Sequence, residues 1–269
     1  MSTILIDFHT HAFPDKIAEK TIAHLEAVTK DIKPMKAHTN GTVSDLKKKM
    51  AEGHVDLAIV LPICTREGQS TSINNFAENI RSDGLLSFGS VFPYQSDRIE
   101  VLKDLANRGF KGIKLHPEYQ QCDIDSDECA EIINKAEELG LLVTVHAGID
   151  PAYRPPYKCT PEKILNLLKK CSGKNLICAH LGSQGMWEDV ISLLCGKDIF
   201  FDTAALYKNI TPEVYKEIIM RHGADKILFA SDCPWENPQN SFDFLSSLGL
   251  SKQEFELITY KNAERLLNL

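Results

Sequence analysis

Two histidines with the spacing of metal ligands follow the first apolar run of the chain, Ile4–Phe8; they are His9 and His11. Side chains two residues apart on a strand point to the same face, so both imidazoles can reach one ion. An isolated His-x-His pair is common by chance and specifies no metal. Three later apolar runs also end in ligand-type side chains, namely His146, His180 and Asp232. Imidazole and carboxylate groups together favour Zn²⁺ or a similar first-row ion, with one position open for water.

The elements that must position these residues alternate along the whole chain. Short apolar runs are separated by windows of helical periodicity, and most runs are apolar on both faces, which is typical of parallel strands covered by helices. An open doubly wound sheet would build its site from only two or three strand ends. Polar, ligand-type residues end more strands than that, which favours a single-domain (β/α)8 TIM barrel over residues 1–269. The predicted strands are 4–8, 55–61, 86–91, 111–116, 141–146, 175–180, 198–203 and 226–231.

The predicted helices begin and end at recognisable signals. Threonine followed by proline, at 160–161 and at 211–212, places a capping hydroxyl before a proline in the first turn. Ser251 and Glu254 form a capping box for the last helix, which is predicted to run to Leu266 or beyond. Glycines 140, 173 and 223 follow helical stripes and permit a left-handed stop. The segment 15–53 is predicted to hold two helices and a loop near 34–41 that covers the site.

Composition and charge exclude several classes of protein. The chain of 269 residues is 43% hydrophobic and 25% charged, as in ordinary soluble proteins. Its net charge of −7 argues against a nucleic-acid partner, which requires a positive surface. No apolar stretch approaches the roughly 20 residues that span a bilayer, and no signal-peptide pattern precedes the first strand. We therefore expect a cytoplasmic protein with a small-molecule substrate and no membrane partner; a homo-oligomer stays open.

Longer motifs accompany these residues. They are DFHTH at 7–11 with Phe13-Pro14, GFKGIKLHP at 109–117, HAG at 146–148, AHLG at 179–182, FASDCPW at 229–235 and NAERLL at 262–267. Together they resemble the amidohydrolase superfamily, and the resemblance spans the whole chain. It is closest to the amidohydrolase-related branch (family 2), which holds metal-dependent hydrolases and non-oxidative decarboxylases. The motifs are specific for the superfamily and only weakly specific for the reaction.

The resemblance implies one divalent ion, with Zn²⁺ as the expected metal, held by His9, His11, His146 and Asp232. His180 would then stand beside the bound water or substrate as a hydrogen-bonding or proton-transferring group. Elementary chemistry agrees, because Zn²⁺ lowers the pKa of its water to about 7 and Asp232 can take the proton. His180 could steady the oxyanion that forms when a carbonyl is attacked. Asp7 could orient His9 or make a simple structural hydrogen bond.

The fourth predicted strand carries two polar residues on one face, Lys114 and His116, and allows two interpretations. In some superfamily members a lysine of this strand is carboxylated and bridges two metals, with the strand-five and strand-six histidines on the second ion. A buried lysine can equally serve as the cation for a substrate carboxylate. Lys114, His116 and Arg154 are therefore the candidate substrate-binding residues.

Three functions follow from this reading. The leading hypothesis is a metal-dependent hydrolase that cleaves a C–N or lactone C–O bond of a small, anionic molecule. The alternative is a metal-dependent non-oxidative decarboxylase of an aromatic or unsaturated hydroxy acid, which would use the same ligands. A non-catalytic metal-binding barrel is the least favoured, since all expected ligands are present together.

Overall fold

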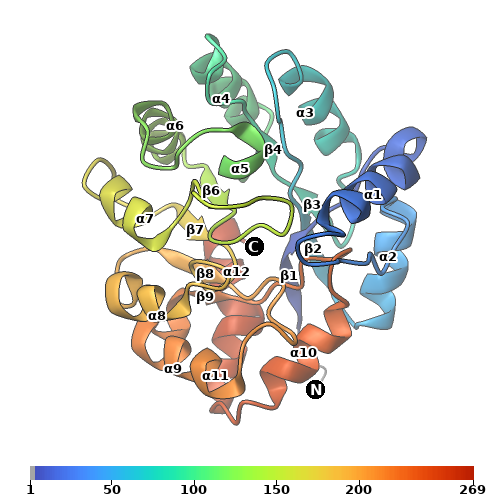
Figure 1. Ribbon diagram of the computed structural model, residues 1–269. Coiled ribbons are helices and arrows are strands. Elements are labelled where there is room, and N and C mark those ends of the chain that lie inside the picture. The colour runs from blue at the N-terminus through green and yellow to red at the C-terminus, as the bar shows by residue number, and fades with distance from the viewer. Residues whose placement is uncertain (1–3) are drawn as a thin grey trace.

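Parallel strands form the centre of the fold, and helices surround them (Figure 1). The computed structural model describes residues 4–269. Its strands form one sheet in the order β1-β2-β3 and a second in the order β4-β5-β6-β7-β8-β9, with parallel pairing throughout. The strands are β1 (Ile6–Thr10), β2 (Leu57–Val60), β3 (Leu85–Ser87), β4 (Gly89–Ser90), β5 (Gly112–Leu115), β6 (Leu142–Val145), β7 (Leu176–Cys178), β8 (Phe200–Asp202) and β9 (Ile227–Leu228).

Backbone hydrogen bonds close these two sheets into one barrel. The Phe8 amide donates to the Phe229 carbonyl at 2.9 Å, which joins β1 to the end of β9. The predicted third strand, 86–91, is divided at Phe88 into β3 and β4, and the Phe88 amide still donates to Val60 at 3.0 Å. Gly89 lies so close to the helix outside it that a Cβ atom there would be 2.6 Å from Leu105. The predicted barrel is therefore confirmed, with its third strand in two segments.

The helices confirm most of the predicted start and stop signals. Thr160, Thr211 and Ser251 cap helices with their side-chain oxygens, and the capping box at Ser251 is complete. Glycines 140, 173 and 223 all have positive φ. The last helix contains a π-helical turn, Leu257–Lys261. The helices are α1 (Asp15–Thr29), α2 (Val43–Glu52), α3 (Ser70–Asn79), α4 (Arg98–Asn107), α5 (Pro117–Gln120), α6 (Asp127–Glu138), α7 (Pro161–Leu167), α8 (Trp187–Asp189), α9 (Pro212–His222), α10 (Pro238–Ser246), α11 (Lys252–Glu256) and α12 (Asn262–Leu267).

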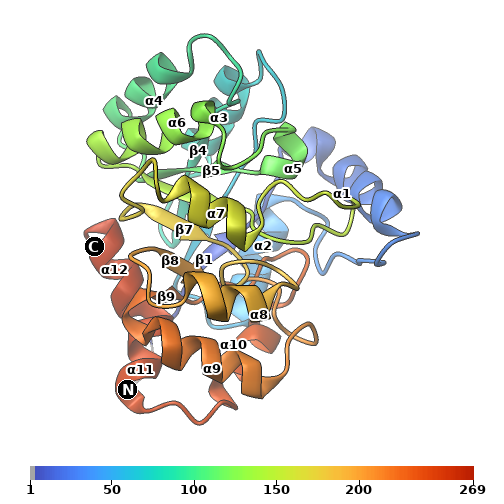
Figure 2. The same cartoon turned by 60° about the vertical axis from the view of Figure 1, so that its left-hand side comes forward.

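The core has two parts. The larger cluster packs the outer faces of the strands against the helices, as with Ile113 and Ile132. The smaller cluster draws side chains such as Phe8, Leu142 and Leu228 from strands around the barrel, together with Leu267 of α12. Helix α12 thereby closes the end of the barrel away from the carboxyl ends of the strands (Figure 2). Within residues 4–269, no helix combines the length and apolar composition that crossing a membrane requires.

The close backbone contact at Gly148 predicts a large stability effect. Gly148 has φ +88°, and a Cβ atom there would lie 2.2 Å from the Gln184 amide nitrogen, a backbone atom that cannot swing away. We expect Gly148→Ala to lower the free energy of unfolding by at least about 3 kcal/mol, because left-handed strain and overpacking add. Gly109→Ala is the matched control, since Gly109 has φ +72° and open space around it. Left-handed strain alone should lower the free energy of unfolding of Gly109→Ala by about 1–2 kcal/mol, as measured by urea unfolding. Equal costs would contradict this account.

Candidate active site

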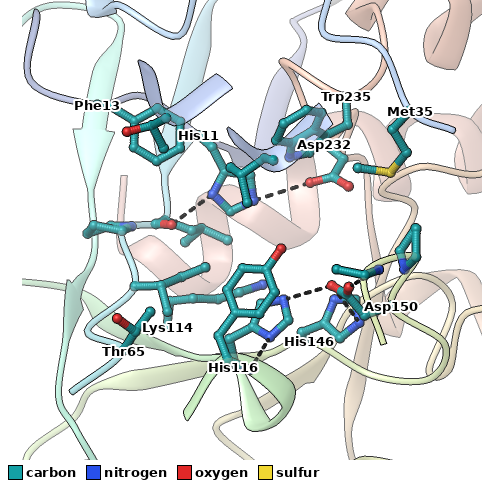
Figure 3. A pocket seen from close by; sticks show the side chains of 18 of the residues that line it. His11, Phe13, Met35, Thr65, Lys114, His116, His146, Asp150, Asp232 and Trp235 are labelled. Atoms are coloured by element: carbon teal, nitrogen blue, oxygen red, sulfur yellow. Dashed lines mark hydrogen bonds and ion pairs between the residues drawn. The ribbon is translucent and has the colours of Figure 1, made fainter. Parts of the chain in front are cut away.

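The carboxyl ends of the strands open into one cavity of about 1270 Å³ (Figure 3). All the histidines and the aspartate predicted at strand ends line it, together with Lys114. The deepest side chains are almost completely buried, with 1% exposure for both His9 and Lys114. The mouth is bordered by α1, α3 and the loop that carries Met35, so the segment after β1 does cover the site as predicted.

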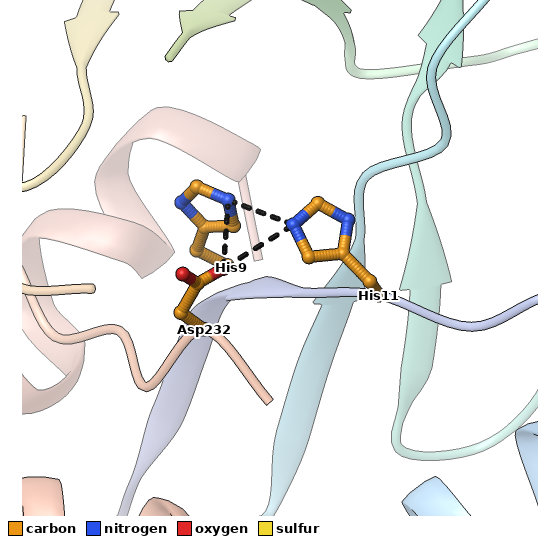
Figure 4. Close-up of side chains that lie close together, drawn as sticks. All are labelled: His9, His11 and Asp232. Carbon is orange, nitrogen blue, oxygen red and sulfur yellow. Dashed lines mark hydrogen bonds and ion pairs between the residues drawn. The ribbon is translucent and has the colours of Figure 1, made fainter. Parts of the chain in front are cut away.

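Three of the four predicted metal ligands converge at the base of this cavity (Figure 4). The Nε2 atoms of His9 and His11 are 3.2 Å apart. Asp232 Oδ1 lies 3.2 Å from His11 Nε2 and 3.5 Å from His9 Nε2. Ligand atoms of a tetrahedral ion with bonds of about 2.0–2.1 Å are separated by roughly 3.3 Å, so these distances suit one small divalent ion.

Hydrogen bonds to the other ring nitrogens fix the tautomers of both histidines. His9 Nδ1 is 2.8 Å from Asp202 Oδ2, and His11 Nδ1 is 2.9 Å from the Leu61 carbonyl. Both partners accept, so each Nδ1 carries a proton, and in the neutral ring each Nε2 presents a lone pair. Two lone pairs and a carboxylate oxygen thus face one another at hydrogen-bond distances. The Lys114 ammonium, 3.1 Å from His9 Nε2, satisfies one of these acceptors, and a divalent ion among the three would satisfy them all.

His180 and His146 form a second pair whose proton positions can also be deduced. His180 Nδ1 donates to the Ala204 carbonyl at 2.9 Å, so in the neutral ring its Nε2 is an acceptor. That Nε2 lies 3.1 Å from His146 Nδ1, which must therefore donate. His146 Nε2 is then an unprotonated acceptor, and it is buried without a hydrogen-bond partner. A buried, unpaired imidazole nitrogen beside the first group is available for a ligand.

The structure places His146 in a different group of ligand atoms from the other three predicted ligands. His146 Nε2 is 4.0 Å from Asp150 Oδ2, and His116 Nε2 is 3.5 Å from the same oxygen. The His116 and His146 rings are stacked, with centroids 4.2 Å apart and planes within 10°. Parallel rings cannot both direct in-plane lone pairs at one ion, so this second group does not form a metal site as it stands. The assignment of His146 as fourth ligand to the first ion stays a prediction.

Lys114 lies beside the cluster of His9, His11 and Asp232. Its Nζ lies 3.1 Å from His9 Nε2 and is fully enclosed. Burial lowers the pKa of Lys114 to about 8, although Asp202 and Asp232 oppose that shift. Burial also raises the pKa of Asp232, but His9, His11 and His180 outweigh it and keep this carboxyl below its usual value. The base of the cavity therefore combines an ionised carboxylate with an ammonium group that loses its proton easily.

The predicted substrate-binding residues do not all reach the cavity. Lys114 and His116 line it, whereas Arg154 is exposed and is not among the lining side chains; its neighbour Tyr153 is. The loop after β6 has no periodic pattern from which side-chain direction could be predicted. The basic side chains that do line the cavity are Lys16, Lys33, Lys36, Arg66 and Lys114.

Sequence reasoning missed Asp202, the partner of the His9 ring. Its second oxygen, Oδ1, accepts the backbone amides of His180 at 2.9 Å and Ala204 at 3.1 Å, so one carboxylate positions two parts of the site. Asp7, proposed as a possible support for His9, bonds instead to the Ser231 amide and hydroxyl and touches His9 only through the backbone. The available signal was a carboxylate inside an apolar predicted strand, 198–203.

With this fold and site, the chain belongs to the amidohydrolase family, whose model matches residues 6–269. It is thus an enzyme of the amidohydrolase superfamily, in which both hydrolases and decarboxylases occur. A sequence search among curated proteins finds no match.

Solved structures resemble the chain over its whole length. A 2,6-dihydroxybenzoate decarboxylase complexed with 2,6-dihydroxybenzoate has a TM-score of 0.72 at 15% identity, with 100% of both chains covered. A dihydroxybenzoic acid decarboxylase from Polaromonas sp. JS666, with bound manganese and the inhibitor 2-nitroresorcinol, has 0.70 at 13%, covering 100% of this chain and 98% of that one. An Acinetobacter baumannii protein described as a 2-pyrone-4,6-dicarboxylic acid hydrolase has 0.67 at 16%, covering 98% and 99%. At these identities the likeness establishes the fold alone.

The contact between Asp202 and His9 predicts a metal-affinity defect. Asp202→Asn weakens the acceptor that orients the His9 ring, so we expect divalent-metal affinity to fall by about 10–100-fold. Asp198→Asn, at the other end of the same segment, removes only a surface contact with Lys226 at 3.5 Å and should bind metal normally. Competition with a chromogenic chelator measures both. Unchanged affinity in Asp202→Asn would show that this carboxylate does not orient the ligand.

Proposed function

We propose that this protein is a metal-dependent hydrolase that uses activated water to cleave a C–N or lactone C–O bond of a small anionic molecule. The observation that carries the proposal is the convergence of His9 Nε2, His11 Nε2 and Asp232 Oδ1 within 3.5 Å, all as acceptors, at the base of a cavity. The proposed ligands are these three residues with His146 as the fourth. Zn²⁺ is the expected ion, and the manganese of one structural neighbour makes Mn²⁺ the main competitor.

A divalent ion held there would supply Lewis acidity and a lowered water pKa at neutral pH. The chain's own residues then divide the remaining work. Asp232 is held ionised, so its carboxylate can accept a proton from water in the cavity. His180 Nε2 is an acceptor, because Ala204 holds its other nitrogen in the donor role; it accepts from His146 Nδ1 at 3.1 Å and would exchange that bond for one to water or substrate. Once protonated, the same nitrogen can donate to the oxyanion or to the leaving group.

The charges of the cavity support an anionic substrate. Five basic side chains line it against three carboxylates, those of Asp150, Asp232 and Glu236. In the whole chain the balance is the reverse, with 30 lysines and arginines against 37 acidic residues. A cavity that is basic inside an acidic protein concentrates anions at its mouth. Lys114, at the base, is the cation best placed to pair with a substrate carboxylate near the proposed ion.

A non-oxidative decarboxylase is the second candidate. Two of the structures compared above are decarboxylases of dihydroxybenzoates, which share this fold. In such a reaction Lys114 would hold the substrate carboxylate, and His180 or Asp232 would deliver the proton that replaces CO₂. The aromatic side chains Phe13, Tyr119 and Trp235 around the cavity suit a flat ring.

The two candidates differ in what the product contains. We expect the purified protein to carry about one divalent ion per chain, and to lose turnover when a chelator removes it. With an active substrate in H₂¹⁸O, hydrolysis places ¹⁸O in the product, whereas decarboxylation releases CO₂ and places solvent deuterium on carbon in D₂O. Amide, lactone and hydroxybenzoate panels provide the substrates. Full activity in metal-free protein would contradict both candidates.

The division of labour predicts opposite defects in two groups of variants. His9→Ala and His11→Ala each remove a coordinate bond and should lower metal content. His180→Ala should keep its metal and lose about 10²–10⁴-fold in kcat, the usual contribution of a positioned acid or base. Asp232→Asn should show both defects. Metal analysis of each purified variant, beside its activity, measures this.

Lys114 provides the control for the two-metal alternative. If a carboxylated Lys114 bridged two ions, Lys114→Ala and His180→Ala would each lose roughly one metal of two. Full metal content in both variants supports one ion with His180 free for catalysis. Parallel loss in both would overturn that division.

A further inference from the structure

The cavity is much larger and more apolar than the polar site at its base. Its volume of about 1270 Å³ exceeds the roughly 300–1,000 Å³ usual for small-molecule pockets. The ligand-type groups lie at the bottom, where His9 and His180 are 1% and 3% exposed, whereas the exposed side chains of Lys16, Lys33, Lys36 and Arg66 line the outer part. The remaining space extends outward between α1 and α3, beyond what a single ring at the base would fill.

Two helices supply apolar side chains to the wall of this outer space, beside the polar residues Lys16, Thr21, His24 and Ser72 of the same helices. On α1, Ile17, Leu25 and Val28 line the cavity, at positions that share one helical face. On α3, Ile73 and Phe76 line it from the other side, three residues apart and so on neighbouring positions of that helix. These five residues are called the apolar groove below.

The apolar groove is left uncovered by the chain's own side chains. Ile17 is 49% exposed and Val28 is 39% exposed, which places them among the most exposed large hydrophobic residues of the described chain. Both belong to the cavity wall and not to an isolated outer surface. Exposed apolar surface that forms a concave wall is typical of a ligand-binding site.

We propose that the substrate is amphiphilic, with a polar anionic end at the base of the cavity and an elongated apolar chain in the apolar groove. This inference rests on the proposed small-molecule site and adds its substrate class. The continuity of the groove with the buried polar site carries it: one cavity joins Lys114 to both helix walls, so a ligand whose head reaches Lys114 can extend its tail along them. Its tail would bury Ile17 and Val28, whose exposure otherwise has no compensation within residues 4–269.

Chain length provides the test. Straight-chain carboxylates from four to ten carbons serve as probes, titrated calorimetrically into the metal-loaded protein below their micelle concentrations. Full burial of a methylene contributes about fourfold in affinity, so the partly open groove should give about two- to fourfold tighter binding for each added methylene. A dissociation constant independent of chain length would overturn the proposal.

Uncharged substitutions test whether the apolar chain of the ligand lies in the apolar groove. The double variant Ile17→Ser/Ile73→Ser should reduce the gain per methylene and leave the affinity of the four-carbon probe unchanged. Met220→Ser is the control, because Met220 is 70% exposed on α9 and does not line this cavity. An undiminished gain in the double variant would contradict the assignment to this groove.

Two further results distinguish this proposal from a subunit interface at the groove and from the proposed hydrolase activity. If chain length has no effect and Ile17→Ser dissociates an oligomer in sedimentation, the groove is an interface between copies and the proposal fails. If the protein binds no divalent metal while the length dependence persists, the proposed hydrolase fails and the amphiphilic ligand stands.

Discussion

The hydrogen bond from the Asp232 amide to the His9 carbonyl, 2.9 Å long, joins the last strand position to the first, and the geometry of the site depends on it. Next to it, the His11 amide donates to the Cys233 carbonyl at 2.6 Å. These two bonds hold ligand-type side chains from opposite ends of the chain at contact distance. Because the bonds belong to the barrel's own ladder, the site is rigid to the extent that the barrel is closed. Folding and the assembly of the acceptor group are therefore one event.

Closure also forces charged groups together inside the protein. Lys114, Asp202 and Asp232 are all nearly or completely buried around His9. Each would be costly alone, and together they compensate one another through the imidazole that separates them. The Asp202 carboxylate uses both oxygens, one accepting from the His9 ring and one from the backbone amides of His180 and Ala204. The proposed ligand His9 and the proposed proton-transfer group His180 are thus bound to the same buried carboxylate.

The sequence was sufficient to predict the features that depend on the periodicity of hydrophobic residues. Alternating strands and helices predict the barrel, and polar residues at strand ends predict the convergence of His9, His11 and Asp232. It was insufficient where the backbone departs from regular geometry. The pairing of β1 with β2 shifts register between Asp7 and Thr10, and the Asp7 side chain bonds to Ser231 instead of the His9 ring. Asp202, the last residue of β8, accepts the hydrogen bond from the His9 ring.

Loops are the second part of the structure that could not be predicted from the sequence. Asp150 reaches the cavity and Arg154 does not, although both belong to the same irregular segment after β6. No hydrophobic pattern distinguishes them, because side-chain direction in such a segment follows from local turns. The division of the third strand at Phe88 is also invisible in the hydrophobic pattern, and α4 packs closely against Gly89 beside it.

The position of α12 has a practical consequence. This helix closes the end of the barrel opposite the cavity, and Leu269, just beyond it, has a side chain that is 64% exposed (Figure 2). A tether attached at Leu269 would leave the mouth between α1 and α3 facing away from a solid support. The barrel can therefore be immobilised in one orientation, with its cavity open to solution, without altering any residue that lines the site.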